Sequence, residues 1–413
     1  MLNMLKKKNA PEEMLKHFLF FALFFPMCTS SYDSPYAPDW ILANVFTTLF
    51  LCTVLIQKRI TWRKQSPLVY VLVALLVLYN AAALVANKMQ LSWYSSQINI
   101  TLSFLTFLGL ICLEKDGLGE TDDVIRFFLQ AVILSNAIGL VPYFLDDYGI
   151  RFMNGQCWIQ PMDPNYYERR YNWIYLHKSQ YAFMLILFLA LIVTYRRLFR
   201  NRWTYWGAIA VMAVGLVISN TMTSIFAALF IFIGMLGDRI FRKDGHFRPK
   251  RLLWLIPVAL VLAFGVYLIA QKRNIFTLGT RTYIWKAGLS ILRENPYGVG
   301  RMAGTSTYPV PIPGSESPYM VTNLHNVFLN LMLQFSPMAG LMIIGMLAAI
   351  AGASLKRNLS FRTLGIWVAL LLPMMMDWCI LLTELPLVLV GLYYIFFSPR
   401  RDQKTEAATD MVS

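Results

Sequence analysis

Charged residues are scarce in this chain of 413 residues: Asp, Glu, Lys and Arg together make up 14%, whereas a soluble domain of ordinary composition carries roughly a quarter. This scarcity excludes a disordered chain and a chain that wraps nucleic acid. Apolar residues make up 57%, and the mean hydropathy of +0.52 argues against a soluble multidomain enzyme. The composition therefore indicates a membrane protein that crosses the bilayer several times.

Cysteine and histidine are also few, with five and four residues. Every cysteine except Cys157 lies in an apolar run, where a thiol behaves as a small hydrophobe. The total of five is odd, and it predicts no disulfide framework. The His, Asp and Glu residues of the connecting segments do not have the spacing of a metal site either. The sequence predicts neither a metal nor another cofactor.

Long apolar runs are abundant. They cover about 15–30, 40–56, 67–87, 97–113, 125–145, 179–195, 204–219, 223–237, 252–270, 324–350, 363–379 and 381–397. A spanning helix needs about 20 residues, so these runs predict an all-α protein of about 12 transmembrane helices. Residues 1–413 form a single membrane domain in this interpretation, and the final pair of helices is short for two full crossings.

The charge of the connecting segments alternates along the chain. The net charge is +15, and an excess of Lys and Arg marks the cytoplasmic side of a membrane protein rather than a nucleic-acid partner. The basic groups that fall on one side are Lys6–Lys8, Lys58, Arg59, Arg63, Lys64, Arg196, Arg197, Arg200, Arg202, Arg239 through Arg251, Lys356, Arg357, Arg362, Arg400, Arg401 and Lys404. The loop 114–123 falls on the same side, but it is acidic and gives no support to the cytoplasmic assignment. Both termini are therefore predicted to be cytoplasmic.

Two segments predicted to be external, 146–178 and 271–323, are longer than a simple connection. The second lies between helices 9 and 10 of the predicted twelve. Both carry more Lys and Arg than is usual for external loops of a membrane protein. These residues are Arg151, Arg169, Arg170 and Lys178 in the first segment, and Lys272, Arg273, Arg281, Lys286, Arg293 and Arg301 in the second. These residues either lie in solvated loops, or bind an anion such as phosphate at the outer membrane surface, since a guanidinium binds phosphate in a bidentate manner.

The residues from Thr280 to Arg293 have the pattern of an amphipathic helix. Arg281, Trp285, Gly288 and Leu292 fall near one stripe, and Thr280 is placed as an N-cap. The helix is expected to stop at Asn295-Pro296, because proline opposes its continuation. An arginine at the positive end of such a helix suits phosphate. A purely structural alternative is an interfacial helix with a snorkelling arginine.

His325 follows an irregular stretch containing Pro309, Pro311 and Pro313 and is expected in the first turn of a spanning helix. A histidine at the boundary of water and hydrocarbon can exchange a proton near neutral pH. The alternative interpretation is an interfacial or helix-capping histidine with no chemical role.

Together these pieces resemble the signature region of the O-antigen ligase and polysaccharide polymerase superfamily. The pattern is Arg281-x-x-x-Trp285, then Asn295-Pro-Tyr-Gly-Val-Gly300, then His325-Asn326-x-x-Leu329 followed by Gly340. The resemblance implies a GT-C-like membrane glycosyltransferase that is metal-independent and inverting. It would act on the outer face of the bacterial cytoplasmic membrane on an undecaprenyl-diphosphate-linked oligosaccharide.

The resemblance also assigns residue roles. Arg281 and His325 match the family's loop arginine and essential histidine, and we expect them to be catalytic. Candidate substrate-binding residues are Arg170, Lys178, Trp285, Arg293 and Asn326. Ligases of the family commonly carry a further arginine where this chain has Ser219-Asn-Thr-Met-Thr-Ser224, and Arg170 or Lys178 is expected to supply that charge instead.

The missing arginine favours a polymerase of an exopolysaccharide, capsule or O-antigen over a ligase that transfers glycan to lipid A core. The partners of such a polymerase would be an acceptor glycan or glycolipid and a chain-length regulator. A lipid-linked glycan flippase or transporter is the alternative of another class. It is less favoured, because transporters concentrate ionisable groups near the membrane midplane, whereas here they gather in the external segments.

Overall fold

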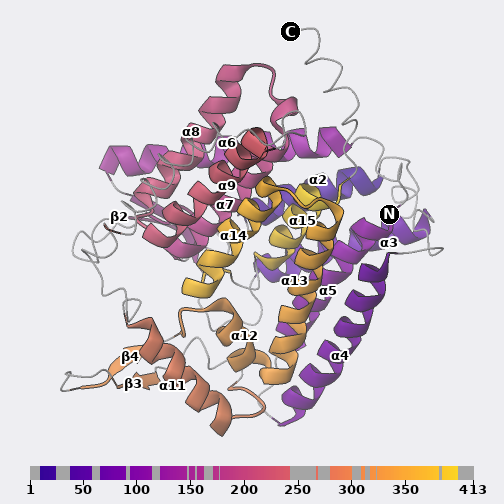
Figure 1. The fold of residues 1–413 in the computed structure, drawn as a ribbon, viewed down its shortest axis with the longest axis vertical. Coiled ribbons are helices and arrows are strands. Elements are labelled where there is room, and N and C mark those ends of the chain that lie inside the picture. The colour runs from indigo at the N-terminus through magenta and orange to yellow at the C-terminus, as the bar shows by residue number, and fades with distance from the viewer. Residues whose placement is uncertain are drawn as a thin grey trace.

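The computed structural model describes residues 10–24, 38–57, 66–89, 94–113, 121–146, 148–153, 156–161, 171–175, 177–241, 267, 280–299, 308–311, 317–321, 323–380 and 384–398. Within these ranges the protein has thirteen α-helices and two short hairpins (Figure 1). The helices are α2 Ala10–Phe24, α3 Pro38–Ile56, α4 Pro67–Met89, α5 Tyr94–Cys112, α6 Thr121–Asp146, α7 Lys178–Thr194, α8 Arg202–Ile218, α9 Met222–Phe241, α11 Arg281–Glu294, α12 Val327–Phe335, α13 Pro337–Arg357, α14 Phe361–Met376 and α15 Leu385–Phe396.

Every apolar run of the sequence except 252–270 overlaps at least one of these helices. The run 252–270 lies outside the described residues apart from Tyr267. In the described part of the chain, four helical segments are long and apolar enough to cross a membrane, namely Pro67–Met89, Asp122–Val141, Met222–Ile240 and Pro337–Arg357. The chain is therefore an all-α membrane protein. The total of twelve spans stays a prediction.

The run 324–350 was expected to be one spanning helix, and that expectation is wrong. It is divided into the short helix α12 and the long helix α13 at Ser336, which has φ 95°. Pro337 disfavours a helical conformation in the residue before it, and the Ser336 hydroxyl instead caps α13 by accepting a hydrogen bond from the Ala339 N–H. His325 consequently precedes a nine-residue helix and not a spanning one.

Helix α7 is enclosed by the rest of the bundle. All fifteen residues from Ser179 to Val193 are buried, and helices α6, α8, α9, α14 and α15 all contact it. An all-round apolar sequence such as YAFMLILFLALIV suits a helix with neighbours on every side. Packing on all sides therefore holds the two ends of α7 in place.

Helices α9 and α14 approach closely through two glycines. A Cβ at Gly365 would overlap the backbone carbonyl of Phe230, and a Cβ at Gly234 would overlap the carbonyl of Phe361. Small residues at membrane helix contacts let backbones come together in this way. The pairing holds the first turns of α14 against α9.

Replacing Gly365 with alanine should destabilise the protein, because the added methyl group meets backbone that cannot rotate away. Overpacking of this kind costs about 1–3 kcal/mol. The thermal unfolding midpoint in detergent should fall for Gly365→Ala. It should stay unchanged or rise slightly for Gly352→Ala, because a Cβ there meets no atom within 4 Å. Equal midpoints for the two variants would contradict the close approach.

The helices place two sets of polar groups at opposite ends. At one end, Arg197 after α7 forms a bidentate ion pair with Asp122 of α6, and Asp238 of α9 accepts backbone hydrogen bonds from the first turn of α14. At the other end, α7 begins at Lys178 and α14 ends at Met376. The basic connections 196–202, 239 and 356–362 thus lie away from the start of α7.

The two long connections contain more regular structure than the sequence indicated. In the first, β1 (Tyr148–Met153) pairs with β2 (Gln156–Pro161); in the second, β3 (Tyr308–Val310) pairs with β4 (Tyr319–Val321), so Pro309 lies in a strand and not in an irregular stretch. Figure 1 shows α11, α12 and the β3–β4 hairpin together at one end of the molecule. They share a small apolar core of Ile284, Leu292, Val310, Val321, Leu324 and Leu333.

Candidate active site

The predicted helix at 280–293 is confirmed as α11, with Thr280 at the N-cap position and Asn295 at the C-cap. Thr280 adopts a left-handed conformation with φ 77° and makes no side-chain capping bond. Arg281, Ile284, Gly288 and Leu292 form the buried stripe, and Trp285 is partly buried beside it. Arg281 therefore starts α11 with its side chain turned into the protein.

The C-terminal turn of α14 is the point at which the site assembles. The last carbonyls of a helix have no partner within it, and here two of them bind the sequence-predicted site residues. Arg281 Nε donates to the Met376 carbonyl at 2.5 Å, and Asn326 Nδ2 donates to the Met375 carbonyl at 3.0 Å. Segments far apart in the sequence thus meet at one helix end.

His325 contacts the next residue of the same turn. Its Nδ1 lies 3.0 Å from Oδ1 of Asp377, and the side chains are 31% and 14% exposed. A neutral imidazole that donates from Nδ1 to a carboxylate has its lone pair on Nε2. His325 also has a left-handed backbone with φ 46°, a conformation that costs energy for a residue with a Cβ and is common at functional sites.

Asp377 is held on both of its oxygens. Oδ1 also accepts the Trp378 N–H at 2.9 Å, and Oδ2 accepts the Ser179 hydroxyl at 2.5 Å. Burial raises the pKa of the Asp377 carboxyl, but its interactions with His325 and the Ser179 hydroxyl outweigh burial and hold the pKa below its usual range. Asp377 is therefore an anion at neutral pH.

The start of α7 adds a further cation. His177 caps the helix by accepting the Ser179 N–H on Nδ1. Lys178 extends to the turn between α8 and α9, where its Nζ lies 3.4 Å from the Asn220 carbonyl. Lys178 thus puts a positive charge at this turn. Arg170 lies outside the described residues.

The other candidate residues differ in their surroundings. Asn326 is nearly buried and caps α12 by accepting the Leu329 N–H. The buried indole Nε1 of Trp285, one turn after Arg281, has no hydrogen-bond partner among the described residues. Arg293 is exposed at the far end of α11, about 18 Å along the helix axis from Arg281. The structure thus brings Arg281, His325 and Asn326 together and leaves Arg293 apart.

Tyr171, which follows Arg170 in the first long connection, does not face a substrate site. It is fully buried, its ring packs against Tyr143 and Tyr181, and its hydroxyl donates to the Gly139 carbonyl. It is a core residue of the bundle. Tyr166 and Tyr167 lie outside the described residues.

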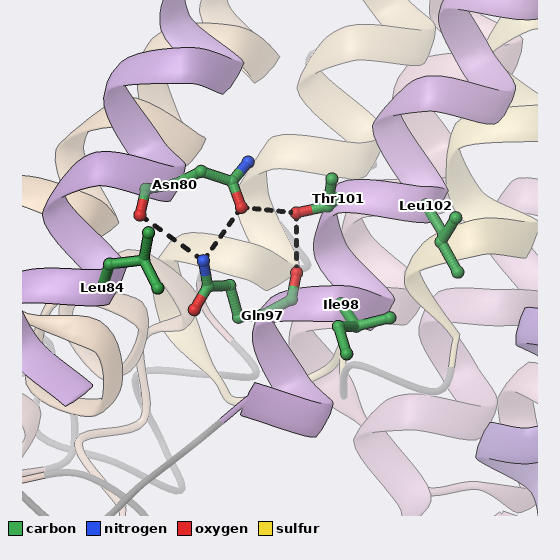
Figure 2. Close-up of a pocket in the computed structure, with 6 residues that line it drawn as sticks. All are labelled: Asn80, Leu84, Gln97, Ile98, Thr101 and Leu102. Atoms are coloured by element: carbon green, nitrogen blue, oxygen red, sulfur yellow. Dashed lines mark hydrogen bonds between the residues drawn. The ribbon is translucent and has the colours of Figure 1, made fainter. Parts of the chain in front are cut away.

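A groove of about 220 Å³ elsewhere in the bundle does not share these features. It opens between α4 and α5, and Figure 2 shows that its polar side chains face one another. Gln97 Nε2 donates to Asn80 Oδ1 at 2.9 Å, and the Thr101 hydroxyl donates to the same oxygen at 3.1 Å. These bonds join two apolar helices, and no charged residue lines the groove. The ionisable cluster around Asp377 is therefore the candidate active site.

Asp377 and Ser179 are the site residues that sequence reasoning missed. Asp377 stands out in the sequence only as a charge inside an apolar run, and it is 52 residues from His325 and 198 from Ser179. A rare acid in an apolar run is a signal for function, but nothing in the sequence names its partner. The packing of α7 and of α12 against α14 brings the three side chains together.

Taken together, the cluster has a group that can accept a proton, two cations and a fixed anion. Among the described residues, no three His, Cys, Asp or Glu side chains meet in a way that could hold a metal ion. The chain matches no protein-family model, and no curated protein matches its sequence.

Proposed function

We propose that this protein is a glycosyltransferase that acts on the outer face of the bacterial cytoplasmic membrane and uses an undecaprenyl-diphosphate-linked oligosaccharide as donor. The single observation that supports this most strongly is the convergence of Arg281 and the His325–Asp377 pair on the last turn of α14. Such a site can stabilise a departing diphosphate and accept a proton from a hydroxyl. Its position at the end opposite the basic connections supports an external location.

The reaction follows from the groups present. The hydroxyl oxygen of the acceptor sugar attacks C1 of the donor sugar, and the bond from C1 to the diphosphate oxygen breaks. The electron pair of that bond leaves with undecaprenyl diphosphate, whose added charge Arg281 and Lys178 stabilise. Nε2 of His325 accepts the proton of the attacking hydroxyl, while Nδ1 stays bonded to Asp377. Direct displacement of this kind inverts C1 and requires no metal.

Polymerisation of oligosaccharide repeat units is the activity we propose, with an exopolysaccharide, capsule or O-antigen as product. Ligation of the glycan to lipid A core is the second candidate. One observation favours it: the contact of Lys178 with Asn220 supplies a cation at the turn where ligases of the superfamily commonly have arginine. Both reactions break the same bond.

The test uses the purified full-length protein in nanodiscs with lipid-linked oligosaccharide extracted from the host membrane, in the presence of EDTA. We expect release of undecaprenyl diphosphate together with a ladder of glycans that grows by whole repeat units. Release that requires added lipid A core, with a single product, would identify a ligase. No release with either acceptor, or transbilayer movement of intact donor in vesicles, would refute glycosyl transfer and point to a transporter.

A further inference from the structure

The contact between Ser179 and Asp377 joins the central helix of the bundle to the site. Ser179 is 1% exposed and lies in the first turn of α7. Its hydroxyl donates to Oδ2, which is the carboxylate oxygen that does not bond to His325. Because α7 is buried along its length, this hydroxyl is a fixed donor, and it restricts rotation of the carboxylate.

The orientation of the carboxylate decides which way the imidazole points. With Oδ2 held by Ser179 and Oδ1 held by the Trp378 N–H, Oδ1 has one position from which to accept the Nδ1 proton of His325. If the carboxylate rotated, the ring could turn and Nε2 would leave the direction of the acceptor. Catalytic groups depend on neighbouring bonds of this kind to stay in the productive geometry.

Ser179 also affects where the proton resides. The carboxylate lies at the first turn of α7, where the helix dipole favours a negative charge, and the Ser179 bond adds to that stabilisation. The ionisable groups that interact with the carboxylate are His325 before α12 and His177, the N-cap of α7. Arg281 on α11 bonds to the carbonyl of Met376, the residue before Asp377. A stabilised carboxylate leaves the proton on Nδ1 of His325, so Nε2 remains the acceptor.

We infer that Ser179 is a positioning residue of the glycosyl-transfer reaction: it acts through Asp377 to hold His325 with Nε2 directed at the acceptor hydroxyl. This inference rests on the proposed function. It differs from a packing role in a measurable way, because a residue that orients the base affects the chemical step and not the binding of the donor.

The experiment measures undecaprenyl diphosphate release by the full-length protein in nanodiscs, with extracted lipid-linked oligosaccharide varied in concentration. Ser179→Ala removes the hydroxyl, Ser179→Cys keeps the volume but donates weakly, and Ser179→Thr keeps the hydroxyl. We expect kcat to fall roughly 10- to 100-fold for the alanine and cysteine variants, the value of one hydrogen bond to a charged group. The KM for donor should change less than about threefold, and threonine should restore most of kcat.

The matched control is Ser103→Ala. Ser103 is also 1% exposed, but among the described residues its hydroxyl bonds only to Asn99 on its own helix α5. The kcat of Ser103→Ala should therefore equal that of the wild type. Wild-type kcat in Ser179→Ala or Ser179→Cys would overturn the inference, and so would equal losses in all three Ser179 variants, which would indicate packing. If Arg281→Ala and His325→Ala also keep wild-type activity, the proposed function itself fails, which is a different outcome.

Discussion

His325→Ala should lower glycan transfer by about 10²- to 10⁴-fold, the usual contribution of a positioned general base. The geometry gives the reason: the Nδ1 side of the ring is engaged by Asp377 at 3.0 Å, so the remaining nitrogen is the one that can take a proton from the acceptor. The loss should be confined to turnover. Binding of undecaprenyl diphosphate, measured with the purified variant, should stay within about threefold of the wild type, because the diphosphate is held by cations.

His17→Ala is the matched control for this variant. His17 also uses Nδ1 for a hydrogen bond, to the Glu13 carbonyl on its own helix α2, and its loss should leave transfer unchanged. Asp377→Asn should reproduce most of the His325→Ala loss, since an amide at that position can hold the wrong tautomer of the ring. Wild-type transfer by His325→Ala, or complete loss of diphosphate binding, would make His325 a structural residue.

The pH dependence should not come from Asp377. Its pKa is held below the usual range for a carboxyl, so Asp377 is already ionised at the pH of the cell. A carboxyl whose pKa is lower in the folded protein stabilises the fold at every pH above its pKa in the unfolded chain, about 4. That stabilisation is lost only as the pH falls toward the lower pKa of the folded state. A fall in transfer on mild acidification therefore reports on another group, and histidine is the residue type that changes charge there.

The sequence allowed much of the local structure around the site to be predicted, because local rules governed it. The spacing of Arg281, Gly288 and Leu292 predicted the buried stripe of α11, and Asn295-Pro296 predicted its end. Gly298, two residues after Pro296, has φ 79°, and a Cβ there would meet the Leu333 carbonyl and the Ser336 amide. These features depend on neighbours within a few residues.

The features that could not be predicted depend on contacts between distant segments. Ser336 with φ 95° ends α12, although the apolar run continues through it without interruption. Asp377 forms hydrogen bonds with Ser179 and His325, which are 198 and 52 residues away from it in the sequence. A charge within an apolar run shows that some partner is needed. Which residue provides it depends on how α7 and α14 pack, and hydrophobic periodicity carries no information on that choice.

Arg281→Ala should reduce transfer by about 10²- to 10³-fold and also weaken binding of undecaprenyl diphosphate, because a cation at a leaving group stabilises the bound and the departing state alike. The guanidinium has five N–H donors in a fixed plane, and its Nε donates to the Met376 carbonyl directly before Asp377. That bond orients the plane beside the His325–Asp377 pair. Arg281→Lys should recover only part of the activity, since an ammonium group is a point charge that cannot reproduce the planar contact.

Arg293→Ala provides the control on the same helix. Arg293 is exposed and lies about 18 Å farther along α11, so its removal changes the net charge of the segment equally but leaves the site intact. Transfer and diphosphate binding should therefore stay close to wild type. Thermal unfolding of both variants separates an effect on stability from one on chemistry, because Arg281 is only 9% exposed and helps to attach α11 to α14. If Arg281→Ala keeps full transfer, the assignment of Arg281 to the diphosphate is wrong. If the two arginine variants lose transfer equally, the basic residues of α11 act through general attraction to the membrane surface, and the assignment is wrong as well.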